Sequence, residues 1–377
     1  MARDIVVLAG SAPHSVLALC KMAKKQGAHA YVVCVDDGFD YYGKSRLITE
    51  SYLTTKVGLE KFWKSFFERN AFVEKPVLYP TTDAACLLID ENRGYYEEHF
   101  ELCMPSHQII ATYNDKTLAE EDAVKWGLTV PKTKVVFDEP GLDELDKVLQ
   151  YPIIAKPQGA IFLHDVGFKF KIIESKEQLS DLREVIRQGC KLVLQEYIPG
   201  DDDDYSFYLF YRGKDGKVHD FTGVKTLQYT GIMAVGTVQR DEKLASICRD
   251  FLNKINYYGI GGIEFKRYNG KYYFIEMSTR TEGFLAIALM SGASLIEASY
   301  LDYTTSQQTI LKAKEKTVYI DTFFWLLNRV KGKKYGKLLQ ELLLFIFKPN
   351  CHMAGLYLDW KFSVVRYWNI LTKGASN

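Results

Sequence analysis

Apolar and polar positions in the first part of the chain follow the pattern of a βαβ unit. Residues 5–9 form a continuous apolar run, and residues 14–26 place apolar side chains at positions 16, 17, 19, 20 and 23, as an amphipathic helix does. After Gly27, a second apolar run covers residues 29–35. This alternation predicts a parallel sheet covered by helices, with ligands bound beyond the carboxyl ends of its strands.

Two later apolar runs are predicted to form a hairpin. Residues 261–266 and 272–276 flank an Asn-Gly pair at residues 269–270, which is a strong signal for a tight turn. Glu264 and Glu276 lie at nearly equal distances from that turn, so their carboxylates can project from the same face. Such a pair repels unless a cation lies between the two groups, and magnesium held by carboxylates and substrate phosphates is the common solution. A hairpin with two solvated surface glutamates is the alternative.

Charged residues also stand at the ends of other predicted elements. An apolar strand over residues 151–157 carries Lys156 near its end, and a second strand over residues 192–198 is broken by a Pro-Gly pair. Asn114 or Asp115 fits as the N-cap of a helix that runs to about residue 126. A lysine at a strand end is commonly a surface residue, whereas on a buried strand it needs an anion or access to water.

The order of these segments along the chain resembles that of the ATP-grasp superfamily, whose members activate a carboxylate as an acyl phosphate and pass it to a nucleophile. Residues 221–229 add a Gly-x-Lys-x-x-Gln pattern that is similar to the one in D-aspartate ligase-like enzymes of bacterial cell-envelope synthesis. The resemblance covers about residues 1–310. It implies an α/β protein with the ATP-grasp fold and the activity of an ATP-dependent carboxylate-amine ligase.

The resemblance also implies a division into domains. Residues 1–113 correspond to the N-terminal βαβ, Rossmann-like domain that precedes the ATP-grasp domain, and Gly10, Ser11 and Asp83 are expected to line its cleft. Asp83 fits equally well as the N-cap of a helix over residues 84–92. The ATP-grasp domain corresponds to residues 114–310, with a lid-bearing subdomain (114–195) and a metal-binding subdomain (196–310); a C-terminal helical and aromatic extension covers residues 311–377.

One set of residues matches the superfamily's nucleotide site. Lys116 and Lys156 match the lysines that contact the phosphates of ATP, a task suited to compact point charges. The adenine hinge and the ribose-binding carboxylate correspond to Gln195, Glu196, Tyr197, Ile198 and Asp204, with Glu196 at the exocyclic amine. For Asp204 an alternative stays open, because residues 201–204 also fit a solvated acidic turn.

A second set matches the groups that hold magnesium and act on the phosphoryl group. The implied Mg²⁺ ligands are Glu264, Glu276 and Ser278. Arg280 matches the arginine that steadies the transferred phosphoryl group, and Lys225 is expected to reach a phosphate or the acyl phosphate. Lysine, arginine and magnesium suffice for this chemistry, since phosphoryl transfer depends mainly on positioning and charge neutralisation.

Two departures from the superfamily pattern concern this site. Asparagine is usual two residues after the second metal glutamate, where this chain has Ser278, so the second magnesium site is expected to be weak. The loop over residues 158–167 lacks a dense glycine-serine phosphate cradle, although it could close as a lid. Lys169 or Lys171 is a candidate for replacing the lost backbone contacts, and His164 is interpreted as incidental.

Composition favours a cytoplasmic enzyme. The 377 residues include 48 Lys and Arg against 47 Asp and Glu. The chain therefore lacks the excess of basic residues that is typical of a dedicated nucleic-acid binder. Seven cysteines with no Cys-x-x-Cys spacing indicate a reducing compartment. The chain opens directly into a predicted strand, without the pattern of a signal peptide, and no apolar run reaches the ~18 residues of a membrane span.

The C-terminal region is basic and then apolar. Residues 312–337 hold eight Lys and Arg against two acidic residues, residues 338–347 are largely apolar, and aromatic residues continue to position 368. A helical region packed on the ligase core is one interpretation. The other is a peripheral contact with the anionic inner face of the membrane, which would suit an enzyme acting on lipid-linked envelope precursors or a surface polysaccharide.

The expected cofactors are ATP and Mg²⁺, and the expected partners are carboxylate and amine substrates, either small molecules or envelope precursors, and a second copy of the chain. The alternative function is a catalytically silent ATP-grasp module that binds nucleotide or regulates, an interpretation to which Ser278 adds weight. The identity of the acceptor does not follow from the sequence.

Overall fold

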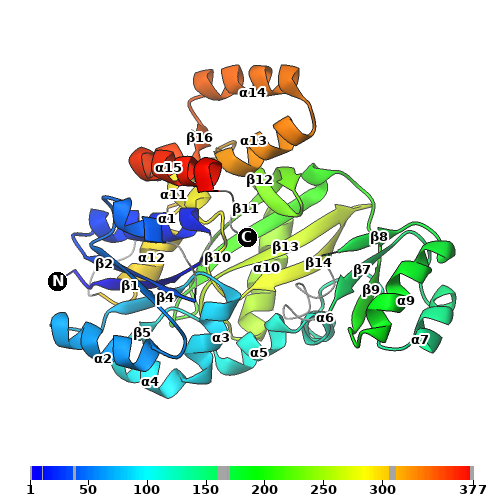
Figure 1. Cartoon of the computed structure of the whole chain (residues 1–377), viewed down its shortest axis with the longest axis horizontal. Coiled ribbons are helices and arrows are strands. Elements are labelled where there is room, and N and C mark those ends of the chain that lie inside the picture. The colour runs from blue at the N-terminus through cyan, green and yellow to red at the C-terminus, as the bar shows by residue number, and fades with distance from the viewer. Residues whose placement is uncertain are drawn as a thin grey trace.

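The described part of the chain folds around three β-sheets (Figure 1). The computed structural model describes residues 2–10, 12–36, 40–158, 168, 170–304 and 311–373. Helices and strands alternate through the N-terminal part, and antiparallel strands dominate the remainder, so the expected mixed α/β class is confirmed.

The N-terminal sheet is parallel, as its pattern predicts. Its strands lie in the order β3-β2-β1-β4-β5, namely β1 (Ile5–Ala9), β2 (Ala30–Val35), β3 (Glu50–Thr54), β4 (Val77–Pro80) and β5 (Glu101–Leu102). The helices are α1 (Pro13–Lys25), α2 (Leu59–Arg69), α3 (Asp83–Glu91), α4 (Arg93–His99) and α5 (His107–Asn114). Alternate residues of β1 pack against α1 on one face and against α2, α3 and α4 on the other, which explains why this strand is apolar throughout.

The N-cap of α3 differs from the expected one. The Thr82 hydroxyl, rather than the Asp83 carboxylate, accepts a hydrogen bond from the Ala85 amide at 3.1 Å. The interpretation of Asp83 as the cap was therefore wrong, because Asp83 is already the first residue of the helix. Its carboxylate is left to interact with other parts of the chain.

A seven-stranded sheet in the order β14-β13-β10-β11-β12-β15-β16 forms the centre of the described structure. Its strands are β10 (Tyr205–Arg212), β11 (Val218–Tyr229), β12 (Ile232–Val238), β13 (Gly259–Tyr268), β14 (Lys271–Ser278), β15 (Val318–Ile320) and β16 (Cys351–Met353). On one face Tyr208 and Phe210 pack against α10 (Glu242–Lys254). On the other, Phe207 and Leu209 pack against α11 (Ala286–Ser291) and α12 (Leu295–Leu301), so β10 is buried on both sides.

The third sheet is small and lies to the right in Figure 1, beyond α6 (Lys116–Lys125). Its order is β6-β9-β7-β8, with β6 (Thr133–Val136), β7 (Ile153–Pro157), β8 (Lys171–Ile173) and β9 (Leu192–Glu196). The Asp115 carboxylate caps α6 by accepting hydrogen bonds from the Thr117 and Leu118 amides, so the predicted helix start is confirmed.

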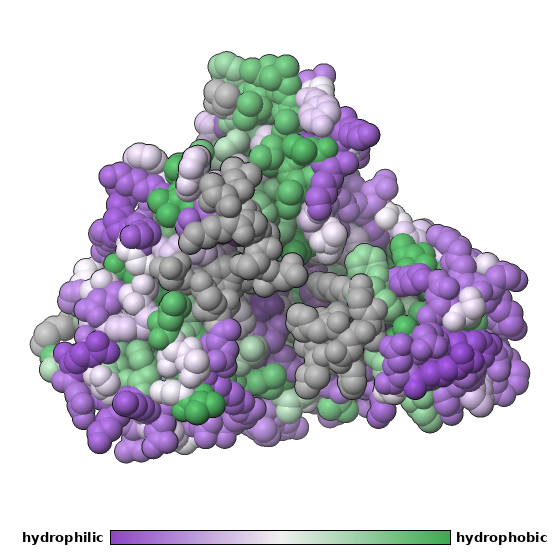
Figure 2. Space-filling view, in the orientation of Figure 1, coloured by the Kyte–Doolittle hydropathy of each residue, from purple (hydrophilic) through white to green (hydrophobic). Residues whose placement is uncertain are grey.

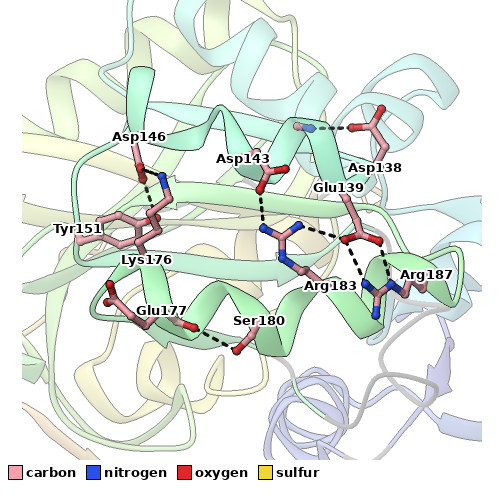
Figure 3. A network of polar contacts seen from close by, with 11 residues as sticks. Asp138, Glu139, Asp143, Asp146, Tyr151, Lys176, Glu177, Ser180, Arg183 and Arg187 are labelled. Carbon is pink, nitrogen blue, oxygen red and sulfur yellow. Dashed lines mark hydrogen bonds and ion pairs between the residues drawn. The ribbon is translucent and has the colours of Figure 1, made fainter.

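Ion pairs join the two helices that cover this small sheet (Figure 3). Arg183 and Arg187 on α9 (Ser180–Arg187) bind Glu139 on α7 (Glu139–Asp143), and Arg183 also binds Asp143. A second pair joins Lys176 to Asp146. Such surface pairs contribute little individually, but together they orient α9 on α7.

The C-terminal region is more than a helical extension. Its helices are α13 (Thr322–Lys331), α14 (Tyr335–Phe347) and α15 (Ala354–Lys373), yet β15 and β16 belong to the central sheet. β15 pairs antiparallel with β12, and β16 pairs parallel with β15. Leu358 and Phe362 of α15 share a hydrophobic cluster with α1, so this region packs on the N-terminal part as well. In the described residues, no helix combines the length and apolar character needed to cross a membrane.

Candidate functional site

The acidic hairpin forms as expected. Asn269 and Gly270 both take left-handed backbone conformations, with φ of 49° and 72°, as a type I′ turn requires. The resulting register places Glu264 directly opposite Glu276. Glu264 is buried and Glu276 is exposed, so the pair lies where the protein interior meets solvent. Ser278 lies two residues beyond Glu276, on the same face of β14, and is buried opposite Gly262.

Lys225 lies against the buried member of this pair. Its Nζ donates to Oε2 of Glu264 at 2.5 Å, and both side chains are buried. Burial raises the pKa of Glu264 to about 7, the carboxylates of Glu276 and Glu282 add to that effect, and Lys225 opposes it. Burial works against the charge on Lys225, but the attraction of Glu264 outweighs it and the pKa of Lys225 is raised. Several carboxylates therefore share one buried ammonium group, which is a strongly negative environment that attracts cations.

Close packing explains the glycines around this cluster. A Cβ at Gly223 would lie 2.2 Å from Cζ of Phe207, and a Cβ at Gly262 would lie 2.6 Å from Cγ of Glu282. Gly223, the glycine of the Gly-x-Lys-x-x-Gln segment, thus makes room for the ring of Phe207 on β10. Gly262 makes room for the side chain of Glu282, a carboxylate that the sequence interpretation missed.

Arg280 connects the hairpin to the N-terminal part. Its Nε donates to Asp83 Oδ1 at 3.0 Å, and its Nη1 donates to Glu282 Oε2 at 3.4 Å. Burial opposes the charge on Arg280, but Glu282 and Asp83 outweigh it and the pKa of the guanidinium is raised. Oε1 of Glu282 and the hydroxyl of Thr279 are buried without a hydrogen-bond partner, so this polar cluster can accept further donors.

The two lysines expected at the phosphates lie beside the small sheet. Lys116 donates to the carbonyl of Pro157 at 3.1 Å, and Lys156 donates to Oε1 of Gln195 at 2.9 Å. Gln195 is buried and donates in turn to Glu120, so its side chain is used within the protein. Burial raises the pKa of Glu120, against the influence of hydrogen bonding and of Lys156.

The expected hinge connects the small sheet to the central sheet. The Glu196 amide donates to the Lys132 carbonyl at 2.8 Å, and the Glu196 carboxylate accepts from the Lys132 amide at 3.2 Å. The Tyr197 amide donates to the Pro152 carbonyl, and Ile198 is buried. Since Glu196 ends β9 and Tyr197 and Ile198 follow it, these residues begin the passage from one sheet to the other.

The acidic run after the hinge is an anchored turn rather than a freely solvated one. Asp204 accepts a hydrogen bond from the Asp201 amide at 3.1 Å and lies 3.7 Å from Arg267. Asp202 accepts from the backbone and the side chain of Gln228, the last residue of the Gly-x-Lys-x-x-Gln segment. The turn therefore fixes the end of the strand that carries the buried lysine.

Tyr205 links the hinge side and the carboxylate side. Burial raises the pKa of its phenol, which lies within electrostatic reach of Lys225 and Glu264 on one side and of Tyr197 on the other. The structure thus brings the hinge, the buried lysine and the acidic hairpin to one region at the start of β10.

Comparisons with known proteins concern the fold of the chain. Neither a described protein family nor a curated protein matches the sequence. Solved structures do match the fold. An ADP complex of N5-carboxyaminoimidazole ribonucleotide synthetase matches with a TM-score of 0.69 at 14% identity, over 88% of this chain and 85% of that one. The corresponding synthetase from Staphylococcus aureus, also with ADP, matches with a TM-score of 0.67 at 16% identity, over 84% and 82% of the two chains.

Biotin carboxylase from Campylobacter jejuni, complexed with β,γ-ATP, matches with a TM-score of 0.62 at 18% identity, over 84% of this chain and 74% of that one. The chain has the ATP-grasp fold. Likeness at this level of identity establishes architecture, and roles for individual residues remain predictions. The finer resemblance to the D-aspartate ligase-like branch is likewise a prediction.

The residues at the centre of this ATP-grasp fold suit a magnesium nucleotide. Within the described ranges, no group of three or more His, Cys, Asp and Glu side chains is arranged to hold a metal ion. Two carboxylates are nevertheless the set that magnesium uses when phosphate oxygens and water complete its octahedron. Glu264 and Glu276 supply that set, and the unpartnered Oε1 of Glu282 lies in the same cluster.

Parts of the expected site lie outside the described residues, namely 159–167 of the lid with His164, and Lys169. Lys171 is described, and its ammonium forms an ion pair with Asp181 on α9. Ser11 of the expected cleft also lies outside the described residues. Asp83 does reach the site, through its contact with Arg280.

Sequence reasoning missed Glu282 and Glu120. Glu282 stands two residues after Arg280 in a polar run, which could have signalled it, since a short polar segment after a buried strand commonly lines a site. Glu120 had no such signal, because its role depends on Gln195, which is 75 positions away along the chain.

Proposed function

We propose that this protein is an ATP-dependent carboxylate-amine ligase that acts through an acyl-phosphate intermediate. The observation that carries the proposal is the buried Lys225–Glu264 pair beside Glu276 and Arg280, at the centre of an ATP-grasp fold. A buried cation among several carboxylates is costly for folding alone, which supports a functional reason for the cluster.

The proposed roles follow from position and charge. Lys116 and Lys156 bind the nucleotide phosphates, residues 195–198 at the end of β9 hold the adenine, and Asp204 binds the ribose. Glu264 and Glu276 would hold Mg²⁺, with Ser278 as a weaker ligand. Magnesium supplies charge neutralisation at the phosphates when it is bound.

The remaining cations act on the transferred group. Arg280, held by Asp83 and Glu282, is fixed in orientation and steadies the phosphoryl group. Lys225, a residue of β11, stabilises the negative charge that develops as the amine attacks the acyl phosphate. The contact between Arg280 and Asp83 joins this part of the proposed site to α3 of the N-terminal part.

The finer proposal concerns the substrates. We infer that the carboxylate and amine come from cell-envelope or surface-polysaccharide synthesis, and that the protein works at the inner face of the membrane, with a homodimer as the assembly. Support comes from the Gly-x-Lys-x-x-Gln segment, in which Gly223 accommodates Phe207 and Gln228 fixes Asp202.

A catalytically silent nucleotide-binding module is the second candidate. The observations that favour it are Ser278 in place of asparagine and the ammonium of Lys225 against the carboxylate expected to bind metal. The two candidates differ in one property, because only the ligase forms an acyl phosphate.

Hydroxylamine tests that property without knowledge of the amine. It attacks an acyl phosphate to give a hydroxamate, so only the carboxylate has to be screened. Purified protein, MgATP, hydroxylamine and a panel of amino acids and sugar acids should give hydroxamate and equivalent ADP with at least one carboxylate. Nucleotide binding without hydroxamate from any carboxylate would favour the silent module.

A further inference from the structure

The helices α13 and α14 form a hairpin that stands out from the rest of the molecule. They project at the top of Figure 1, above β12 and away from the N-terminal sheet. Figure 2 shows hydrophobic side chains gathered at this top edge, over α14, and continuing downward toward α13.

The outer face of α14 is apolar and exposed. Tyr335, Leu339, Leu343 and Phe347 recur every four residues, and they are 59%, 60%, 50% and 78% exposed. A spacing of four places these side chains along one stripe of the helix. A helix of a globular protein normally turns such a stripe toward the core, because burying large apolar side chains stabilises the fold.

The inner face of α14 instead carries its acidic residue. Both carboxylate oxygens of Glu341 accept hydrogen bonds from Arg329 on α13, at 2.5 and 2.7 Å, and the Trp325 indole donates to Glu341 at 2.8 Å. The rings of Trp325 and Phe345 are in edge contact with centroids 5.3 Å apart. These contacts fix the orientation of α14, so that Glu341 faces α13 and the apolar stripe faces solvent. A surface helix usually has the opposite arrangement, with its apolar side chains inside and its charged ones outside.

Lysines lie at both ends of α14 and in the turn that connects it to α13. All five lysines between residues 330 and 350 are exposed: Lys331, Lys333, Lys334, Lys337 and Lys348. Glu341 is the only acidic residue in that interval, and Arg329 neutralises it. The hairpin is therefore apolar along the outer face of α14 and positive at the two ends of that helix.

A second apolar stripe lies on α15. Trp360, Val364 and Trp368 recur every four residues beyond the non-helical Asp359, and each is at least 51% exposed. Between the two helices, an apolar cleft of about 300 Å³ is lined by Phe345, Cys351, His352, Met353, Leu356 and Tyr357. Exposed tryptophans next to basic residues are typical of surfaces that lie at the boundary between lipid headgroups and acyl chains.

We propose that the outer face of the α13–α14 hairpin binds the surface of an anionic lipid bilayer, with the apolar stripe of α14 inserted among the lipids and the lysines at the headgroups. Charge decides between this occupant and a second copy of the chain. A symmetric dimer through α14 would bring the same five lysines of each copy together, whereas an anionic leaflet neutralises them.

The hairpin is connected to the proposed catalytic strand. The side-chain amide of Asn328 on α13 donates to the carbonyl of Gln228 at 3.0 Å, and Gln228 ends the segment of β11 that begins at Gly223 and includes Lys225. Membrane contact would therefore hold this strand near the lipid surface. The binding itself does not depend on ligase activity, so it can be tested without ATP or substrate.

Co-sedimentation of the full-length protein with vesicles is the test. Phosphatidylcholine vesicles with phosphatidylserine should carry the protein to the pellet at low salt, and phosphatidylcholine alone should not. Raising the salt to 1 M shortens the screening length from about 10 Å at 0.1 M to about 3 Å and should weaken binding. Protein that stays in the supernatant with anionic vesicles at low salt would overturn the proposal.

Matched variants assign the binding to this face. Leu339→Glu with Leu343→Glu, and separately Lys334→Glu with Lys348→Glu, should each weaken binding by at least about tenfold. Exposed positions elsewhere serve as controls, with Val73→Glu for the apolar pair and Lys61→Glu with Lys64→Glu for the lysines. Binding unaffected by both hairpin variants would contradict the proposal.

Light scattering tests the alternative, in which a second copy of the chain binds this face. If wild type is a dimer that Leu339→Glu with Leu343→Glu converts to a monomer, and vesicles bind neither form, then the face is a subunit interface and the proposal is wrong. The lysine variant keeps the test decisive if the apolar variant fails to fold, because its two positions are fully on the surface of the hairpin.

Discussion

At the scale of single residues, the site depends on how a few charges are shared. Glu264 is buried with a pKa raised to about 7, and Lys225 is its hydrogen-bonded partner. Glu276 stands opposite it at the surface. The exposed carboxylate costs the fold little, so its substitution separates function from stability better than that of either buried residue.

Glu276→Gln should lower ADP formation by at least about 100-fold while leaving the unfolding temperature nearly unchanged. The substitution keeps the shape of the side chain but removes a charge that a magnesium ligand requires, and even outer groups of metal sites contribute 10–100-fold. Glu97→Gln is the control, since Glu97 is an exposed residue whose carboxylate makes a surface ion pair with Arg93. Full ATP turnover by Glu276→Gln would refute the metal assignment.

Ser278→Asn should lower the magnesium concentration needed for half-maximal activity several-fold. A carboxamide reaches farther than a hydroxyl from the same strand position, and Ser278 shares its face of β14 with Glu276. Activity titrated against magnesium at saturating ATP measures the effect, with thermal unfolding to verify that the buried position accepts the larger side chain. An unchanged magnesium requirement in a stable variant would show that position 278 is not a ligand.

At the scale of elements, the C-terminal region is joined to the N-terminal part through a buried polar contact. His14 Nδ1 on α1 lies 3.3 Å from Oδ2 of Asp321 and 2.8 Å from the Tyr319 hydroxyl on β15. Asp321 also caps α13 by accepting from the Phe323 and Phe324 amides. The Asp321 carboxylate thus fixes the start of α13 and connects it to α1.

Asp321→Asn should reduce the free energy of unfolding by about 1–3 kcal/mol at pH 7, because asparagine keeps the cap but loses the charge that faces His14. Burial opposes the charge of Asp321, but His14, Arg366 and backbone hydrogen bonding outweigh it and the pKa lies below its usual value of 3.8. A lowered carboxyl pKa stabilises the fold above the unfolded value, and that contribution is lost as the pH falls through the folded value.

The part of the stability difference between wild type and Asp321→Asn that comes from this carboxyl group should therefore shrink as the pH falls below about 4. Urea unfolding at several pH values measures it. A variant as stable as wild type at pH 7, or a difference that grows on acidification, would contradict this account of the contact.

The sequence predicted those elements whose signals are local. The Asn-Gly turn between apolar runs defined the β13–β14 hairpin, and Asp115 defined the start of α6. The strands β15 and β16 escaped prediction, because three residues are too few to show an alternation and their pairing is decided by distant neighbours. Local chemistry could not reveal the reversed polarity of α14 either, since that depends on the partner of Glu341.

At the scale of the whole molecule, the proposed site is assembled from segments that are far apart in the sequence. Arg280 meets Asp83 across 197 positions, and Lys225 meets Glu264 across 39. The order of motifs predicted the fold, which the structural comparisons confirm. It could not reveal that Glu282 completes the cluster, nor that Thr82 rather than Asp83 caps α3 and leaves Asp83 for Arg280.

The central claim is that this assembly couples ATP cleavage to amide formation. The most direct measurement is ADP release over a matrix of carboxylates and amines, with product mass determined by mass spectrometry, for wild type and Glu276→Gln in parallel. We expect at least one pair of substrates to give magnesium-dependent ADP release in a one-to-one ratio with an amide product, and Glu276→Gln to lose both signals together. Wild-type protein that binds MgATP yet releases no ADP above background with any pair, or ADP release that Glu276→Gln retains in full, would contradict the account.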